Sequence, residues 1–252
     1  MELRIACVAG GTSGIGRNVV LSLLERGYHV LAVGKGAKHA QELNEQTERW
    51  QNTLLIECAD LSKMDDATKI GELIERRWGK LDVLVNSAGT ISGGGIEKER
   101  FSDWEHVLAT NLDSLFTLTK ACLPSLKKGD HPNIVNISSV CSLRPCASLS
   151  YSVSKAGTDM FTKVLARELA VYRIRVNAVN PGVVRSNLQY SAGLFSSEAS
   201  YENWIEEMKR AHPLGEIGEP SDITNIVLFL TSNEAKWITG AIVSVDGGRA
   251  IA

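Results

Sequence analysis

The sequence predicts an α/β fold, in which a parallel sheet is covered by helices on both faces. Short apolar runs of strand length alternate with longer segments whose apolar residues recur at helical spacing. This alternation is typical of parallel sheets, because each crossover between parallel strands carries a helix onto one face. The chain of 252 residues, 44% of them hydrophobic, is long enough for one such core. We therefore expect a single domain over residues 1–252.

The strands and helices are expected in a regular order. The strands span residues 4–9, 28–33, 54–58, 81–85, 134–137, 174–179 and 241–245. The helices span residues 17–26, 37–50, 65–78, 101–127, 151–172 and 221–231. Pro124 should kink or end the helix at 101–127, because proline has no N–H to donate. Residues 187–211 have weak periodicity and many serines and glutamates, so we expect a substrate lid there.

A glycine-rich segment, Gly10 to Gly16, joins the first strand to the first helix. Strand, glycine-rich turn and helix form the context in which a dinucleotide-binding fingerprint occurs. Glycines at positions 10, 14 and 16 let the backbone turn tightly and approach a pyrophosphate. The helix N-terminus behind them offers free N–H groups and a partial positive charge. The alternative is a glycine-rich turn in an α/β unit that binds nothing.

The end of the second strand bears on which dinucleotide is bound. In such folds an acidic residue here binds the ribose 2′-hydroxyl of NAD, and a basic one suits the 2′-phosphate of NADP. No Asp or Glu lies between Val33 and Lys38, Gly34 leaves room, and Lys35 offers a positive charge. The sequence therefore predicts NADP (NADPH) in preference to NAD. NAD stays the alternative, because Ser13 in the glycine loop is uncharged and loop lysines are commonly solvated.

Small and polar residues follow the fourth and sixth strands, as Asn86-Ser87-Ala88-Gly89 and Pro181-Gly182. Ligands of open α/β sheets bind at the carboxyl ends of strands, and small residues there let a cofactor lie close to the backbone. Asn111 lies among apolar neighbours inside a predicted helix, which is unfavourable for a polar residue. It is either a surface or capping residue, or a water-binding group beneath the site.

Tyr151 and Lys155 lie four residues apart, so both share one face of a helix. An ammonium beside a phenol favours the phenolate and lowers the pKa of the tyrosine from about 10. The tyrosine can then give or take a proton near neutral pH. Tyr-x-x-x-Lys alone is common by chance, and it gains weight here from the other motifs.

Composition and charge exclude several classes of function. The formal net charge of −2 gives no basic excess for nucleic acid or an anionic membrane surface. The longest apolar runs have strand length, and the N-terminal segment lacks a signal-peptide pattern, so we expect no membrane span and a cytoplasmic protein. The histidines are scattered along the chain, and we expect no metal site. They are His29, His39, His106, His131 and His212.

The five cysteines form no close pair with metal-ligand spacing. Cys7, Cys58 and Cys122 lie in apolar segments and are expected to be inert core residues. Cys141 and Cys146 fall just before Tyr151, where a redox role is the alternative. A reducing cytosol suits all five as thiols.

Together these motifs resemble the short-chain dehydrogenase/reductase family over nearly the whole chain. The matching pieces are Gly10-x-x-x-Gly14-x-Gly16, Asp60, Asn86-Ser-Ala-Gly89, Asn111, Asn136-Ile-Ser-Ser139, Tyr151-x-x-x-Lys155 and Pro181-Gly182. The resemblance implies a Rossmann-type, doubly wound sheet of seven parallel strands in a three-layer αβα sandwich. It also implies a nicotinamide cofactor, and it suggests a homotetramer or homodimer built on the two long helices and the C-terminal segment.

The resemblance also assigns roles to residues. Tyr151 would be the acid/base, and Lys155 would bind the nicotinamide ribose and lower the pKa of the tyrosine. Ser139 would hold the substrate oxygen, and Asn111 would anchor a water in a proton relay. The residues expected to bind the cofactor are Gly10, Thr12, Ser13, Gly14, Ile15, Gly16, Gly34, Lys35, Asp60, Leu61, Asn86, Ser87, Ala88, Gly89, Tyr151, Lys155, Pro181, Gly182, Val184 and Ser186.

Two departures from the family pattern affect these roles. Ala9 stands where the family usually has threonine, so one hydrogen bond of the glycine loop is expected to be absent. Ser139 and Tyr151 are twelve residues apart, one fewer than is usual in the family. We expect the loop at residues 140–150 to be one residue short, and Ser138 stays open as the active serine.

The implied reaction is reversible hydride transfer between the nicotinamide and a carbonyl or secondary alcohol, with a carbonyl (ketone) reductase as the first choice. The alternatives are a 3-oxoacyl-thioester (acyl-carrier-protein) reductase, an NAD-dependent secondary-alcohol, sugar or steroid dehydrogenase, and a non-catalytic NADP(H)-binding sensor. Tyr172 stands where the acyl-carrier subfamily often has a basic residue. A basic patch for an acyl carrier would consist of Lys127, Lys128, Arg173 and Arg175.

The predicted lid is rich in large apolar side chains. They are Leu188, Tyr190, Leu194, Phe195, Tyr201 and Trp204. These residues indicate a substrate with an apolar part. The alternative is that they pack the lid onto the body of the domain.

Overall fold

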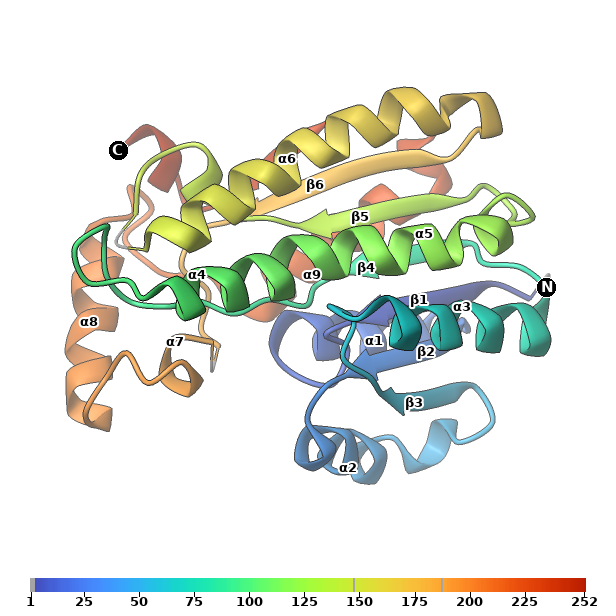
Figure 1. Ribbon diagram of the computed structural model, residues 1–252, viewed down its shortest axis with the longest axis horizontal. Helices are drawn as coiled ribbons and strands as arrows, with labels where there is room; N and C mark the ends of the chain where they lie inside the picture. The colour runs from blue at the N-terminus through green and yellow to red at the C-terminus, as the bar shows by residue number, and fades with distance from the viewer. Residues whose placement is uncertain (1–2, 147, 187) are drawn as a thin grey trace.

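The structure is a computed structural model that describes residues 3–146, 148–186 and 188–252. Within these residues seven parallel strands form one sheet in the order β3-β2-β1-β4-β5-β6-β7. The strands are β1 (Ile5–Ala9), β2 (His29–Gly34), β3 (Leu54–Cys58), β4 (Val83–Asn86), β5 (Asn133–Ile137), β6 (Arg175–Pro181) and β7 (Ile242–Val245). The predicted Rossmann-type, doubly wound parallel sheet is confirmed (Figure 1).

Helices cover both faces of this sheet and complete a three-layer αβα sandwich. One face packs against α3 (Met64–Trp78), α5 (Ser114–Leu126) and α6 (Leu149–Leu169). The other packs against α1 (Gly14–Glu25), α2 (Ala37–Gln46) and α9 (Pro220–Thr231). In Figure 1, α5 and α6 lie in front of the sheet and α9 lies behind it. In the described part of the chain, no helix is long and apolar enough to cross a bilayer.

Strand β1 shows how a continuous apolar run divides the core. Ala6 and Val8 belong to the cluster that contains α1 and α9, whereas Ile5, Cys7 and Ala9 belong to the cluster under α3, α5 and α6. Successive side chains of a strand point to opposite faces, so a strand covered on both faces is apolar at every position. None of the five is more than 3% exposed.

The predicted helix at 101–127 is interrupted, but not at Pro124. It consists of α4 (Phe101–Leu108), a π-helical turn (Ala109–Asp113) and α5, which continues past Pro124 to Leu126. The expectation that Pro124 ends the helix is therefore wrong. A proline in the last turn removes one hydrogen bond from a helix that has little length left to lose. The π turn contains Asn111. Single π turns inside α-helices are frequent at functional sites.

The predicted lid folds into two helices, α7 (Leu188–Ser191) and α8 (Glu198–Arg210). Its first predicted residue, 187, lies outside the described residues. Ser197 caps α8, because its hydroxyl accepts the N–H of Ser200. Figure 1 shows α7 and α8 beyond the arrowheads of the central strands, at the carboxyl edge of the sheet.

The cysteines differ from expectation at three positions. Cys7 and Cys122 are buried, as predicted, whereas Cys58 is exposed where β3 leaves the core. Cys141 and Cys146 are joined in a disulfide, with their Cα atoms 5.5 Å apart. The expectation of five free thiols is therefore wrong for this pair, which folding of the short loop brings together.

Candidate active site

A large pocket opens at the carboxyl edge of the sheet, with a volume of about 1130 Å³. Its walls come from the glycine-rich loop, the ends of β2, β4, β5 and β6, the start of α6 and the lid helices. The crossover connections of a parallel sheet bring these segments together at one edge. In the described part of the chain, no group of three or more His, Cys, Asp or Glu side chains could hold a metal ion.

Most residues that the sequence marks as functional line this pocket. They are Gly10, Thr12, Ser13, Gly14, Ile15, Gly34, Lys35, Ser87, Ala88, Gly89, Ser139, Tyr151, Lys155, Pro181, Gly182, Val184 and Ser186. Five others lie outside its lining, namely Gly16, Asp60, Leu61, Asn86 and Asn111. Leu61 packs in the core under α3, and Asn86 donates a hydrogen bond to Asn136, 2.9 Å away.

The glycine-rich loop has the shape of a cradle at the N-terminus of α1. Gly10 has a φ of +69°, and a Cβ there would lie 2.7 Å from the backbone nitrogen of Ala88. A Cβ on Gly16 would lie 2.2 Å from the carbonyl oxygen of Gly10, so the turn closes tightly. Gly14 faces open space, with nothing within 4 Å of such a Cβ. The loop therefore fits a pyrophosphate, which would approach bare backbone at a helix N-terminus.

The end of β2 leaves no room for a side chain at position 34. A Cβ on Gly34 would lie 2.1 Å from the hydroxyl oxygen of Thr12. The next residue, Lys35, forms an ion pair with Asp60 at 2.9 Å, and 66% of its side chain is exposed. A hydrogen bond from Ser62 and the pairing with Lys35 lower the pKa of Asp60 to about 2. Lys35 therefore pairs with Asp60 while most of its side chain stays in contact with solvent.

Ser139 and Tyr151 meet inside the pocket. Ser139 follows β5, and the backbone N–H of Cys141 donates to its Oγ at 3.1 Å. Ser139 interacts with the phenol of Tyr151 and lowers its pKa, against the effect of burial. Tyr151 lies in the first turn of α6, where its N–H donates to the capping Ser148 hydroxyl at 3.4 Å. The serine hydroxyl is therefore held between a backbone donor and the phenol.

The pKa of Tyr151 differs from the expectation that Lys155 lowers it. Burial raises this pKa above its ordinary value, and only the hydrogen bond from Ser139 opposes the rise. Lys155 instead directs its Nζ to the carbonyl oxygen of Ile137 at 2.8 Å, and this Nζ lies 5.5 Å from the centre of the tyrosine ring. Desolvation of the phenolate therefore outweighs the distant ammonium. Burial also lowers the pKa of Lys155 itself to about 8, although the nearby carboxylate of Asp159 opposes this shift.

Ser138 has a different environment from its neighbour. Its Oγ donates to the carbonyl oxygen of Lys155 at 3.0 Å, and the residue is 2% exposed. Successive residues at the end of a strand point to opposite sides. Both serines line the pocket, but the hydroxyl of Ser138 donates to the backbone of α6, whereas that of Ser139 lies beside Tyr151.

Asn111 is buried beneath the site, with 2% exposure, so the alternative of a surface residue is wrong. Its Oδ1 accepts the N–H of Thr90 at 2.7 Å, and its Nδ2 donates to the Thr90 carbonyl oxygen at 2.9 Å and to Ser154 Oγ at 3.0 Å. The side chain thereby ties the loop after β4 to helix α6.

A buried carboxylate next to the catalytic cluster is missing from the sequence prediction. Asp159 accepts hydrogen bonds from Ser142 Oγ and from Asn180 Nδ2, the latter at 3.0 Å. Asp159 lies four residues after Lys155, so the spacing used for Tyr151 and Lys155 also indicates this residue. Arg144 and Arg249 also line the pocket, but no local pattern marks them because the fold alone brings them there.

The lid contributes apolar side chains to the pocket wall. Leu188, Leu194, Phe195, Trp204 and Met208 line it. The ring of Phe195 lies 5.3 Å from the ring of Trp204, centre to centre. The side chains of residues 190 and 191 lie outside the described part. The lid residues therefore do more than pack the lid onto the domain.

A nucleotide-sized cradle beside a serine, a tyrosine and a buried lysine is the arrangement of an oxidoreductase that uses a nicotinamide cofactor. Comparison with known proteins agrees. A family model described as enoyl-(acyl carrier protein) reductase matches residues 9–250. The chain belongs to the short-chain dehydrogenase/reductase family, whose members of this kind act on CH–OH and C=O groups.

Similar proteins cover nearly the whole chain. The 3-oxoacyl-[acyl-carrier-protein] reductase FabG of Thermotoga maritima is 30% identical over 100% of this chain and 99% of its own length. The FabG of Staphylococcus aureus is 33% identical over 96% of each chain.

Solved structures also superimpose on the chain. Ligand-free aldohexose dehydrogenase of Thermoplasma acidophilum has a TM-score of 0.90 and 29% identity, and covers 100% of this chain and 95% of its own. The Pseudomonas aeruginosa RhlG/NADP active-site complex has a TM-score of 0.88 and 27% identity, over 98% and 96%.

Proposed function

We propose that the chain is an NADP(H)-dependent carbonyl (ketone) reductase with Tyr151 as its acid/base. The observation that carries this proposal is that Ser139, Tyr151 and Lys155 line one pocket together with the glycine-rich cradle and the apolar lid. The proposal places the enzyme in the cytoplasm and its reaction in the direction of reduction, because the NADP pool of cells is mostly reduced.

The residues of the site have complementary tasks in this proposal. When bound, the nicotinamide cofactor supplies or takes up a hydride. Ser139, oriented by the N–H of Cys141, donates to the substrate oxygen as negative charge develops there. Tyr151 gives that oxygen a proton, and we assign Lys155, whose Nζ lies 5.5 Å from the centre of the tyrosine ring, to binding the nicotinamide ribose.

Asn111, the glycine loop and the strand ends complete the proposed site. Asn111 fixes the Thr90 loop, and we assign it the anchoring of a water in the proton relay. Gly10 and Gly14 form the cradle for the pyrophosphate. The cofactor would lie along Gly34 and Lys35, Ser87 to Gly89, and Pro181 to Ser186, all of which contribute to one pocket.

Lys35 is the proposed reader of the 2′-phosphate of NADP. Lys35→Asp should lower the ratio of kcat/KM with NADPH to kcat/KM with NADH by about tenfold to a hundredfold, the range for losing a charge-assisted hydrogen bond. It removes the cation beside Asp60 and adds a second carboxylate, which a ribose hydroxyl tolerates and a phosphate does not. Steady-state rates with both cofactors measure the ratio.

Lys38→Asp is the matched control for this change. Lys38 is exposed on α2 and does not line the pocket, so it makes the same change in net charge three residues away. Its cofactor ratio should stay within about twofold of the wild type. Equal effects of both substitutions would indicate that the cofactor ratio responds to the overall electrostatic field near the pocket. That result would contradict the assignment of Lys35 as the residue that binds the 2′-phosphate.

The relatives favour a second candidate, a 3-oxoacyl-thioester reductase whose substrate is bound to an acyl carrier protein. The basic patch expected for such a carrier is only partly available. Arg175 turns inward and donates to the carbonyl oxygens of Ser232 and Ile238 at 3.3 and 3.4 Å. Lys128 pairs with Glu75, and Lys127 lies 3.8 Å from the ring centre of Tyr172.

The direct test is oxidation of NADPH and NADH by the purified protein. The panel contains 3-oxoacyl thioesters on acyl carrier protein, free ketones, α-dicarbonyls, ketoses and ketosteroids. Turnover of free ketones above that of the carrier-bound thioesters supports the first proposal, and the opposite order supports the second. Tight binding of NADPH without turnover of any compound, in either direction, would favour a non-catalytic sensor.

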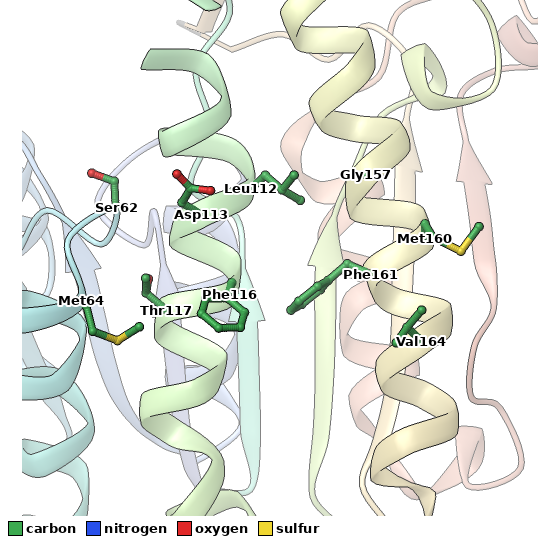
Figure 2. A pocket seen from close by; sticks show the side chains of 10 residues that line it. All are labelled: Ser62, Met64, Leu112, Asp113, Phe116, Thr117, Gly157, Met160, Phe161 and Val164. Atoms are coloured by element: carbon green, nitrogen blue, oxygen red, sulfur yellow. The ribbon is translucent and has the colours of Figure 1, made fainter. Parts of the chain in front are cut away.

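A second copy of the chain is the proposed partner of the outer face of α5 and α6. A groove between these helices is lined by apolar side chains, and Figure 2 shows Phe161 reaching from α6 toward Phe116 on α5. Phe116, Met160 and Val164 are 48%, 59% and 53% exposed. The resemblance to the family supports a homotetramer or homodimer built here.

The oligomer should dissociate when a charge enters this groove. Met160→Lys should shift the mass in light scattering toward the 27.4 kDa of one chain, because a buried lysine would lose its hydration. Lys163→Glu, on the same helix but outside the groove lining, should leave the mass unchanged. A wild-type protein that already has the mass of one chain would contradict the proposal.

A further inference from the structure

The loop between Ser139 and Tyr151 contains a disulfide that the proposed reaction does not use. It joins Cys141 to Cys146 and encloses residues 142–145. Both cysteines, together with Arg144 and Pro145, line the active-site pocket. The cross-link therefore lies in the pocket wall, in the loop that joins Ser139 to Tyr151.

The two ends of this cross-link contact different parts of the site. The N–H of Cys141 orients the Ser139 hydroxyl at 3.1 Å. At the other end, Cys146 Sγ lies 3.1 Å from the hydroxyl oxygen of Ser152, in the first turn of α6. The disulfide thus ties the turn after β5 to the helix that carries Tyr151.

The two halves of the loop are anchored unequally by other contacts. Ser142 Oγ donates to the Ser139 carbonyl oxygen at 2.8 Å and also to the buried carboxylate of Asp159. These bonds hold the catalytic serine turn whether or not the cross-link is closed. Arg144 instead contacts the C-terminal turn, where it donates to the carbonyl oxygen of Arg249 at 2.6 Å. Opening the disulfide should therefore loosen the pocket wall at 143–146 more than the serine turn.

The sulfurs also differ in access, which is what disulfide exchange needs. Cys146 is exposed and Cys141 is half-buried. Cys7 and Cys122 are buried in the core, so a reagent in solution reaches Cys146 before them. The exposed Cys58 has no disulfide partner in the described part of the chain.

We propose that Cys141 and Cys146 form a thiol–disulfide redox site that fixes the wall of the substrate pocket, so that substrate binding depends on the thiol redox state. The site goes beyond the proposed function, because it concerns regulation rather than the reaction. In a reducing compartment the pair is a dithiol, and the disulfide forms when low-molecular-weight disulfides accumulate.

The exchange proceeds in two steps that balance. The Cys146 thiolate attacks one sulfur of a small-molecule disulfide such as glutathione disulfide, which forms a mixed disulfide and releases one thiol. The Cys141 thiolate then attacks the Cys146 sulfur and releases the second thiol. The small-molecule disulfide is reduced, the two cysteines are oxidised, and their two protons end on the released thiols or in solvent.

The first measurement is the redox state of the pair. The full-length protein is equilibrated in glutathione buffers of graded ratio, alkylated and digested with trypsin. Arg144 precedes Pro145, where trypsin does not cut, so both cysteines stay on the peptide 129–155. Mass spectrometry should show this peptide doubly alkylated in reducing buffer, and cross-linked without alkylation in oxidising buffer.

The second measurement is the consequence for the pocket. On reduction, the KM for the carbonyl substrate should rise about threefold to tenfold while kcat changes less than about twofold, because only the wall loses its cross-link. Amide hydrogen exchange at 143–146 should speed up about tenfold, and this readout needs no turnover. It therefore decides the proposal even if the proposed substrate class is wrong.

Two variants separate the pair from other thiol effects. Cys146→Ser should give the KM and exchange rate of the reduced protein in every buffer, and Cys58→Ser should respond like the wild type. A peptide that stays doubly alkylated in oxidising buffer would overturn the proposal. So would a disulfide that forms without any change in KM or in hydrogen exchange.

Discussion

Tyr151→Phe should lower kcat/KM for carbonyl reduction by about a hundredfold to ten-thousandfold, the range for loss of a general acid. The substitution removes only the hydroxyl that we propose as the proton donor and that interacts with Ser139. Tyr151 is 8% exposed, and the phenylalanine ring fills the same space. The Kd for NADPH, measured by fluorescence titration, should therefore stay close to the wild-type value. Tyr172→Phe, on an exposed tyrosine, is the control that should change neither quantity.

The pH profile distinguishes the chemical role of this tyrosine from a structural one. For the wild type, kcat/KM for the cofactor reports ionisations of the free enzyme, and the pKa of Lys155 is lowered to about 8. The lysine is charged below that pH, so the rate should be constant there and should fall as the pH rises through 8. In Tyr151→Phe the residual rate should keep this fall, which belongs to Lys155, and should lose only the further fall expected of the wild type at higher pH, where the phenol of Tyr151, with its pKa raised by burial, ionises. Near wild-type activity of Tyr151→Phe would contradict the proposed role of Tyr151 as the general acid.

Much of the fold could be predicted because the sheet is covered on both faces. Strands such as β1 are apolar at every position, and the helices between them have apolar residues at helical spacing. The order of strands and helices can therefore be predicted from the sequence. The interruption of the helix at 101–127 could not be read in this way. A π turn holds one more residue than an ordinary helical turn, but no residue type in the sequence marks its position. Only the tertiary packing around Asn111 reveals it.

The features of the site also form two groups. Some follow from the local spacing of residues, and others depend on contacts between distant parts of the chain. Tyr151 and Lys155 could be found because one helix fixes their spacing. The direction of the Tyr151 pKa shift could not be predicted from the sequence. It depends on how deeply α6 is buried and on which carbonyl oxygen accepts a hydrogen bond from Lys155. The Lys35–Asp60 pair likewise joins the ends of two strands that neighbour each other only in the sheet.

Ser139→Ala should lower kcat by about a hundredfold to a thousandfold, as expected when a donor to a developing oxyanion is removed. Ser138→Ala, one residue earlier, should keep kcat within about threefold of the wild type. The structure separates the two serines: Ser139 interacts with the phenol of Tyr151 and lowers its pKa, whereas Ser138 donates to the backbone of α6. Their order in the sequence could not make this distinction, because the spacing of twelve residues between Ser139 and Tyr151 left both serines open as the active one.

The two alanine variants control for each other in stability. Each loses a hydrogen bond to the backbone: Ser138→Ala loses the buried bond to the Lys155 carbonyl oxygen, and Ser139→Ala loses the part-buried bond from the Cys141 N–H. Each should therefore lower the free energy of unfolding by about 1 kcal/mol. Similar shifts in denaturant midpoint, with a large loss of kcat in Ser139→Ala alone, would assign the catalytic hydroxyl to Ser139. The reverse pattern of kcat would assign it to Ser138, and the segment 140–146 would then have to turn differently when substrate binds.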